Sequence, residues 1–278
     1  MVSLITSGRN DDYGKGFMNR FYTSVSKNLE SLNKLNIEYE YLIVEWNPFN
    51  PYLIYSNEFS DLFKSNKNLK DIIATPSLNL KEGLSINAFH EYYAKNLGIR
   101  QSLYENLIIL NADIVIPFET MKEMIDIIKE GLDEKKYYRP AMRVQCNDRL
   151  HELRKGRVDS PALPEHSYYM KITGDFPGDL FMINKSTLIN YGKGYDETNI
   201  LHRNGSQVHM DSEIMYNLYH SGCTLEYLDS EYYHIEHDRS HRLGEIRMKN
   251  INGYQNKENW GFKKYSIKKI NNNLILIG

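Results

Sequence analysis

Residues 105–120, ENLIILNADIVIPFET, contain two apolar runs that are separated by an Asn and an Asp. The first run, 107–110, is typical of a buried strand, and the second, 114–116, continues in the same apolar character. Asn111 and Asp113 stand between them. A buried carboxylate costs free energy unless a partner satisfies it. That partner could be a metal ion, a hydrogen-bond network or the solvent at a strand end.

The spacing of Asn111 and Asp113 allows both side chains to act together. Residues two apart in an extended chain point in the same direction, so two oxygen ligands at this spacing could hold a divalent cation. Mg²⁺ and Mn²⁺ prefer such oxygen ligands and in turn bind phosphates. The alternative is an Asx-turn that ends the strand, and the tripeptide by itself favours this alternative.

The sequence around this stretch alternates between short apolar strands and amphipathic helices. Continuous apolar strands that are separated by helices indicate a largely parallel sheet covered on both faces. We therefore predict an α/β fold, a single domain with a Rossmann-like, mostly parallel sheet flanked by helices. The expected strands are 2–6, 41–44, 71–74, 107–110, 181–183 and 224–228, and the expected helices are 17–32, 85–102, 118–130 and 211–219.

Composition excludes several classes of protein. The chain has 278 residues, 41% hydrophobic and 25% charged, and a formal net charge of −2, so no basic field indicates binding to nucleic acid. Cys146 and Cys223 form neither a disulfide framework nor a zinc spacing, which favours a reducing compartment and a cytoplasmic location. We expect no signal peptide and no transmembrane segment, because no apolar run is long enough.

Polar clusters follow the predicted strands at their carboxyl ends, where open α/β sheets bind ligands. In the first cluster, which begins at Thr6, backbone N–H groups and Arg9 could contact a nucleotide. Glu45 ends the second strand and could accept hydrogen bonds from a base or a ribose hydroxyl. Each cluster taken alone could also be an ordinary polar strand end.

Acids and histidines gather in the second half of the chain, around and after two predicted mobile loops at 147–170 and 192–209. Asp211 begins a helix, where it could be an N-cap or, in a cleft, a general base. Asp175 lies upstream in a segment that we expect to reach the same side. His234 follows an apolar strand, so it could complete a metal site begun by Asp113. The alternative for this cluster, which also contains His237 and His241, is a solvated charged turn.

Together these segments resemble a GT-A glycosyltransferase of the family 2 type. The resemblance covers about residues 2–240, and Asn111-Ala112-Asp113 stands where the family has D-x-D. The segments that carry it are SGRND with YG (7–14), VEWNP (44–48), YAKNLGIR (93–100, similar to A-R-N-x-G), NAD (111–113), GDF (174–176), HMD (209–211) and YHIEH (233–237).

The resemblance implies transfer of a sugar from a nucleoside diphosphate sugar, with a UDP-sugar favoured, to the hydroxyl of a glycan or other acceptor. It implies inversion with Asp211 as general base, whereas a retaining reaction would point to Asp175. It also implies that Asp113 and His234 hold Mn²⁺ or Mg²⁺. The implied donor contacts are Thr6, Gly8, Arg9, Asn10, Glu45, Lys95, Asn96, Asn111 and Ala112.

The implied domain is 1–245, with a nucleotide-sugar half at about 1–117 and an acceptor half at about 118–245. Residues 246–278 form an extension packed on the same domain, and a homodimer is possible. Asn111 departs from the family pattern, which leaves open an inactive nucleotide-sugar-binding protein of this fold. A metallohydrolase built on the histidine cluster is the other alternative, although its spacings do not match His-Glu-x-x-His.

Overall fold

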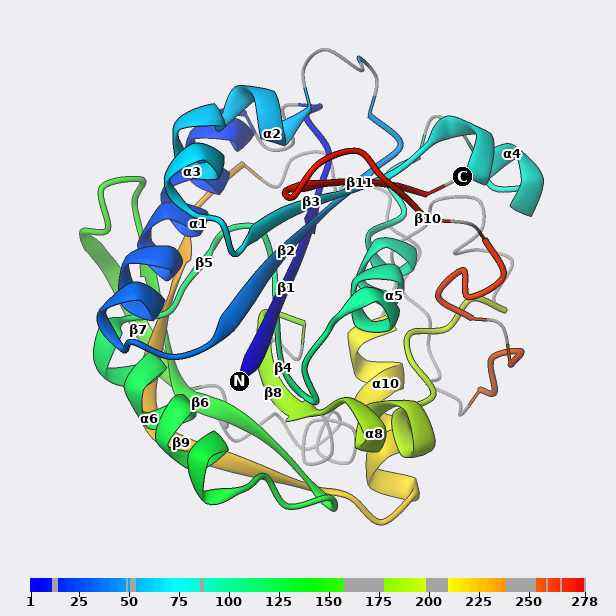
Figure 1. Ribbon diagram of the computed structural model, residues 1–278. Helices are drawn as coiled ribbons and strands as arrows, with labels where there is room; N and C mark the ends of the chain where they lie inside the picture. The colour runs from blue at the N-terminus through cyan, green and yellow to red at the C-terminus, as the bar shows by residue number, and fades with distance from the viewer. Residues whose placement is uncertain are drawn as a thin grey trace.

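An eleven-stranded sheet forms the centre of the molecule in the computed structural model (Figure 1). The strand order is β10-β11-β3-β2-β1-β4-β8-β6-β9-β5, and β7 pairs with β6 outside this path. The structure describes residues 1–11, 15–48, 50, 54–85, 88–157, 178–198, 210–238, 254–258, 260–265 and 267–277. The strands are β1 Val2–Gly8, β2 Tyr39–Trp46, β3 Leu69–Ala74, β4 Asn106–Leu110, β5 Ile114–Val115, β6 Lys136–Cys146, β7 Glu152–Arg157, β8 Leu180–Asn184, β9 Thr224–Ile235, β10 Ile267–Lys269 and β11 Leu274–Ile277.

The first half of the sheet is parallel from β11 through β3, β2 and β1 to β4. The antiparallel pairs involve β8, β7, β5 and β10, and β6 and β9 are again parallel. The predicted α/β fold, with a mostly parallel sheet flanked by helices, is therefore confirmed. The helices are α1 Phe17–Lys34, α2 Tyr55–Glu58, α3 Ser60–Ser65, α4 Pro76–Glu82, α5 Glu91–Gln101, α6 Phe118–Glu130, α8 Lys185–Thr187 and α10 Met210–His220, with a π-helix at Leu188–Gly192.

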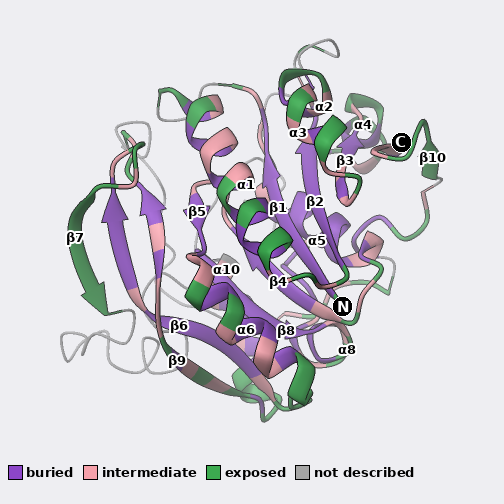
Figure 2. Cartoon of the chain, turned by 60° about the vertical axis from the view of Figure 1, so that its left-hand side comes forward, coloured by how far each residue is buried: buried purple, intermediate pink, exposed green. Residues whose placement is uncertain are grey.

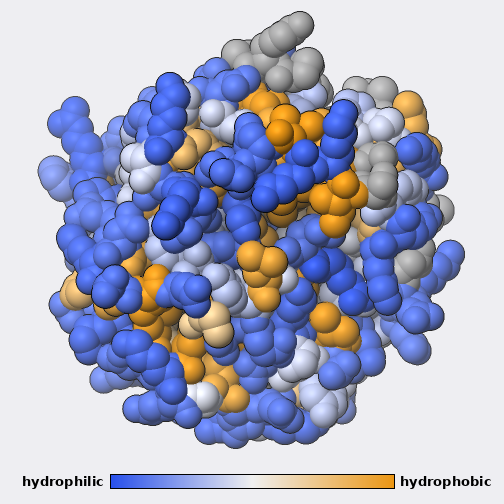
Figure 3. Space-filling view, in the orientation of Figure 1, coloured by the Kyte–Doolittle hydropathy of each residue, from blue (hydrophilic) through white to orange (hydrophobic). Residues whose placement is uncertain are grey.

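Two hydrophobic cores cover the two faces of the sheet, because successive strand residues point to opposite sides. In β1, Leu4 packs into the core beneath α1 and α6, and Ile5 packs into the core beneath α5 and α10. Figure 2 shows the buried strands between helices whose outer faces are exposed. The face in Figure 3 is mostly hydrophilic, with apolar residues in separated areas. None of the described helices has the length and apolar character that a membrane span requires.

Helix α5 lies directly against the sheet. A Cβ on Gly98 would come within 2.5 Å of Ile5 Cγ2 and 3.0 Å of Val44 Cγ2, so only glycine allows this approach. Close packing here fixes the height of α5 over β1 and β2. This matters for the site, because α5 carries Lys95.

Several parts of the described chain differ from the sequence expectations, and strand β6 was not predicted at all. Helix α5 begins at Glu91, although the pattern predicted a start at residue 85. The predicted loop 147–170 contains β7, whose residues are all exposed and therefore show no apolar alternation. The C-terminal strands β10 and β11 were not predicted, and β11 extends the sheet beside β3. Most of the two predicted mobile loops lies outside the described residues.

Candidate functional site

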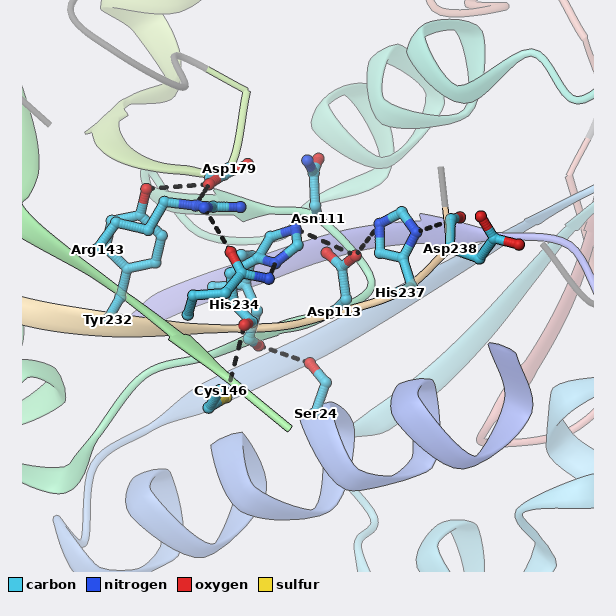
Figure 4. A network of polar contacts seen from close by, with 12 residues as sticks. Ser24, Asn111, Asp113, Arg143, Cys146, Asp179, Tyr232, His234, His237 and Asp238 are labelled. Atoms are coloured by element: carbon cyan, nitrogen blue, oxygen red, sulfur yellow. Dashed lines mark hydrogen bonds and ion pairs between the residues drawn. The ribbon is translucent and has the colours of Figure 1, made fainter. Parts of the chain in front are cut away.

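A cluster of one carboxylate and two imidazoles lies where β4 turns into β5 (Figure 4). Asp113 Oδ2 is 3.5 Å from His234 Nε2 and 3.2 Å from His237 Nε2. Strand pairing builds the cluster, since His234 in β9 lies opposite Ile114 of β5. The N–H of Ile235 also donates to the Asp113 carbonyl at 2.9 Å. Sequence reasoning placed Asp113 and His234 together but did not assign His237 to this site.

This donor set fits a divalent metal ion. The three ligand atoms lie within 4.8 Å of one another. Burial alone would raise the pKa of Asp113, but the neighbouring His234 and His237 and the more distant Arg20 outweigh it and hold that pKa below its ordinary value. The carboxylate is therefore ionised at neutral pH. A mixed set of carboxylate and imidazole ligands suits Mn²⁺ or a later transition metal better than Mg²⁺.

Asn111 does not turn its side-chain oxygen to this cluster. Its Oδ1 accepts a hydrogen bond of 2.6 Å from Lys95 Nζ. The Lys95 ammonium is fully buried and also lies 2.9 Å from Glu91 Oε1 and 3.9 Å from Asp211 Oδ1. Burial would lower the pKa of Lys95, but Glu91 and Asp211 hold it above its ordinary value, so the ammonium stays charged.

The Lys95 environment favours an Asn over an Asp at position 111. Two carboxylates, Glu91 and Asp211, already lie beside the buried ammonium of Lys95. A third carboxylate at position 111 would leave an excess of negative charge in a poorly solvated place. The neutral amide oxygen of Asn111 accepts a hydrogen bond from the ammonium without adding charge.

Asp211 is held in the first turn of α10 with properties that suit a general base. Its Oδ2 accepts a hydrogen bond of 2.9 Å from the Tyr92 hydroxyl. Burial raises the pKa of Asp211 to about 6, with Lys95 opposing the shift and Glu91 adding to it. Gly178 packs against the carboxylate so closely that any Cβ there would overlap both of its oxygens. A positioned carboxylate with a pKa near neutrality binds a proton more readily than an ordinary Asp and is still largely ionised at pH 7.

Buried polar atoms gather at the carboxyl ends of β1 and β2. Glu45 Oε2 accepts a hydrogen bond of 3.0 Å from the Tyr55 N–H, and burial, with Asp71 nearby, raises the pKa of Glu45 well above its ordinary value. Within the described part of the chain, Glu45 Oε1, Thr6 Oγ1 and the Tyr55 hydroxyl make no hydrogen bond. Buried polar atoms are almost always satisfied in native proteins. A bound ligand with matching polar groups would satisfy these three.

The other predicted donor contacts lie at different places around this edge. Arg9, next to Gly8 and Asn10, pairs with Asp11 at 2.8 Å. Ala112 packs against the core beneath α1. Both N–H groups of the Asn96 amide donate within the chain, to Tyr195 O at 2.9 Å and Glu197 Oε1 at 2.8 Å, and its oxygen accepts from Tyr195 N at 2.7 Å.

These contacts of Asn96 connect α5 to residues 195–197. Asp175 and His241, which the sequence also singled out, lie outside the described residues.

Solved structures similar to this one were found by comparison of folds, whereas no protein-family model and no curated protein sequence matches the chain. TarS of S. aureus, residues 1–349, aligns with a TM-score of 0.50 and 14% identity over 84% of this chain and 60% of its own. The same protein in complex with UDP-GlcNAc gives a TM-score of 0.51 and 12% identity over 88% and 61%.

A second protein, GalNAc-T7 with UDP, GalNAc and Mn²⁺, aligns with a TM-score of 0.56 and 15% identity. The alignment covers 86% of this chain and 44% of GalNAc-T7. The chain therefore spans about half to three fifths of the length of the structures that it resembles. At these identities the likeness establishes the fold.

Proposed function

We propose, from the GT-A fold that the chain shares with these structures, that it transfers a sugar from a nucleoside diphosphate sugar to an acceptor hydroxyl. The observation that carries the proposal is the position of Asp211. It combines a raised pKa, a hydrogen bond from Tyr92 and a charge contact with Lys95. UDP-sugars are the favoured donors, since UDP-GlcNAc is bound in TarS and UDP in GalNAc-T7.

In the proposed reaction Asp211 takes the proton of the acceptor hydroxyl, and the resulting nucleophile attacks the sugar with inversion. Lys95 and Tyr92 stabilise the ionised carboxylate before the proton arrives. The cluster of Asp113, His234 and His237 would hold a divalent ion, preferably Mn²⁺, and the ion would supply positive charge to the leaving diphosphate. Lys95 supplies a second, fixed positive charge at the same edge of the sheet.

The nucleoside would bind at the carboxyl ends of β1 and β2. Thr6, Gly8, Arg9, Asn10 and Glu45 are the residues that we assign to it. The buried Thr6 hydroxyl and Glu45 Oε1, which have no hydrogen bond within the described residues, support this assignment. Asn111 would affect donor binding indirectly, through its hydrogen bond with Lys95. Ala112 would contact the donor only through its backbone.

The decisive experiment combines nucleotide binding with turnover. Thermal-shift measurements with a panel of nucleotide sugars, with and without Mn²⁺, identify the donor, because a ligand that binds only the native state raises Tm. Asp211→Asn keeps the size of the side chain but removes the base. We expect it to abolish transfer while the donor still raises Tm. Turnover retained by this variant would exclude Asp211 as the base.

A second candidate function is donor binding without chemistry, and Asn111 is the observation that favours it. A protein of this kind would show a donor-dependent rise in Tm but no transfer to any hydroxyl acceptor. It would also tolerate Asp211→Asn without loss of any measurable property except stability. The same two assays therefore separate the two candidates.

A further inference from the structure

A buried chain of hydrogen bonds leads from Asp179 to His234 (Figure 4). Strands β6 and β9 are neighbours with Gln145 beside His234 and Arg143 beside Tyr232. Asp179 Oδ2 accepts from Arg143 Nε at 2.7 Å, and Arg143 Nη1 donates to Gln145 Oε1 at 2.7 Å. Gln145 Nε2 then lies 3.1 Å from His234 Nδ1.

The direction of these bonds follows from the chemistry of the groups. A guanidinium only donates hydrogen bonds, so the atom of Gln145 that faces Arg143 must be its oxygen. The amide NH₂ of Gln145 therefore faces His234 and donates to Nδ1. A ring nitrogen that accepts a hydrogen bond carries no hydrogen. The hydrogen of His234 is thus on Nε2, which faces Asp113 Oδ2.

His237 has the opposite arrangement. Its Nδ1 lies 3.0 Å from the backbone carbonyl of Asp238, and a carbonyl only accepts. Nδ1 therefore carries a hydrogen, and Nε2, which lies 3.2 Å from Asp113 Oδ2 and donates to that carboxylate, can release its own hydrogen and offer a lone pair to a metal ion. A histidine that donates through one nitrogen to a carbonyl and presents the other as a lone pair is in the form that binds metals.

We propose that Gln145 holds His234 in the tautomer that donates to Asp113, so that Asp113 and His237 are the metal ligands of this cluster and His234 is a positioning residue. The inference rests on the metal site of the proposed function. Coordination by His234 Nε2 would place a hydrogen on Nδ1 against the Gln145 NH₂. Turning the amide over would instead bring the NH₂ against Arg143. Either change puts two donors face to face in a buried place.

The substitution Gln145→Glu replaces the group that donates a hydrogen bond to His234 Nδ1 with one that accepts a hydrogen bond from it. A carboxylate accepts from Arg143 with one oxygen and from His234 Nδ1–H with the other, and it has nearly the same size as the amide. His234 Nδ1 then carries a hydrogen, so Nε2 can give up its own hydrogen and offer a lone pair to a metal ion in the cluster. ¹⁵N spectra of the histidine rings in the metal-free protein read the tautomer directly. We expect His234 Nδ1 to carry no hydrogen in the unsubstituted protein and to carry one in Q145E.

Manganese binding, followed by electron paramagnetic resonance, gives the second readout. We expect His237→Ala to weaken binding at least about tenfold more than His234→Ala does. Q145E gains a ligand and binds Mn²⁺ about tenfold tighter, the usual scale of outer-shell effects on metal-binding histidines. The double variant Q145E/H234A is the control for the added charge, and in it the gain disappears. Tm of each variant, measured in parallel, excludes unfolding.

Three results would overturn the proposal: an Nδ1–H tautomer of His234 in the unsubstituted protein, equal losses of Mn²⁺ affinity in H234A and H237A, or a gain in Q145E that survives in the double variant. Absence of any Mn²⁺ binding by the unsubstituted protein would instead contradict the metal site of the proposed function. The ring spectra need no metal, so they decide the role of Gln145 in either case.

Discussion

Lys95 shows at the scale of one residue how charge balance shapes the site. The buried ammonium has contacts with Glu91, Asn111 and Asp211, which come from α5, the turn after β4 and the start of α10. Removing one partner of such a buried group is strongly destabilising, because the remaining charges lose their compensation. A change of residue 111 is therefore expected to change the pKa of Asp211, although the two residues lie far apart in the sequence.

The substitution Asn111→Asp tests this balance. We expect the new carboxylate to raise the pKa of Asp211 further, because a like charge nearby disfavours ionisation. The acid limb of the pH profile of kcat/KM should move to higher pH, and Tm should fall. Asn111→Ala, which removes the acceptor without adding charge, should leave the limb in place. An increase in transfer and in Mn²⁺ affinity in N111D would show instead that residue 111 belongs to the metal site.

The titration of Asp211 predicts opposite effects on activity and stability. The pKa of this carboxyl is about 6 in the folded protein and 3.8 in its ordinary state. Transfer needs the ionised form, so kcat/KM should rise as pH increases through about 6. The folded state binds the proton more tightly than the unfolded state, so the contribution of Asp211 to stability is present below about pH 4 and is lost as pH rises through 6. Asp211→Asn should remove this part of the pH dependence of Tm.

At the scale of the element, the contact of α5 with the sheet carries the site. We expect Gly98→Ala to destabilise the fold by about 1–3 kcal/mol through overpacking against Ile5 and Val44, partly offset by about 1 kcal/mol of helix propensity. It should also lower kcat, because α5 carries Lys95. Urea unfolding and transfer assays measure the two effects. Gly156→Ala in the exposed β7 is the matched control, since no atom lies within 4 Å of its Cβ position, and it should change stability by less than about 0.5 kcal/mol.

A helix or strand could be predicted where its own stretch of sequence carries the pattern, such as an apolar run or helical spacing. The strands β1 to β4 and the helices α1 and α6 follow from apolar runs and from helical spacing. Strand β6 does not, because it carries Arg139, Arg143 and Gln145 at buried positions. These polar residues are compatible with burial only through partners such as Leu180, Asp179 and His234, which lie far away in sequence.

The same distinction separates the predicted site residues from those that were missed. Asp113, His234 and Asp211 stand next to strand or helix boundaries, where a single sequence shows them. The tautomer of His234 depends on the pairing of β6 with β9, and no local pattern contains that information. Asn96 shows the reverse case, because its motif suggested a ligand contact, whereas long-range hydrogen bonds to Tyr195 and Glu197 give it a role in packing that no local pattern indicates.

At the scale of the whole molecule, buried acids determine how stability depends on pH. Burial raises the pKa of Asp71 to about 7, of Glu197 to about 7 and of Glu213 to about 8. Each of these groups favours the folded state below its ordinary pKa, and this contribution disappears as pH rises through the folded value. Asp113 has the opposite shift, so its contribution is present above its ordinary pKa of 3.8 and is lost as pH falls further.

We therefore expect Tm to be highest in mildly acidic solution, at about pH 4–5, and to fall steadily towards pH 8. Thermal denaturation across pH 3–9 measures this profile. Glu213→Gln, which replaces the acid with a neutral group of similar shape, should flatten the decline between about pH 5 and 8. A profile with its maximum at pH 8 would contradict the assignment of these acids as protonated in the folded state.

The position of β11 has a consequence for biosynthesis. Asn273, just before β11, donates to the carbonyl of Leu69 at the start of β3, across 204 residues of sequence. While the ribosome is still making the intervening chain, the outer edge of β3 has no partner strand. A sheet edge in this state attracts other extended chains. The nascent protein must therefore be kept from its neighbours until residues 274–277 have emerged, and the late arrival of β11 ends this period of exposure.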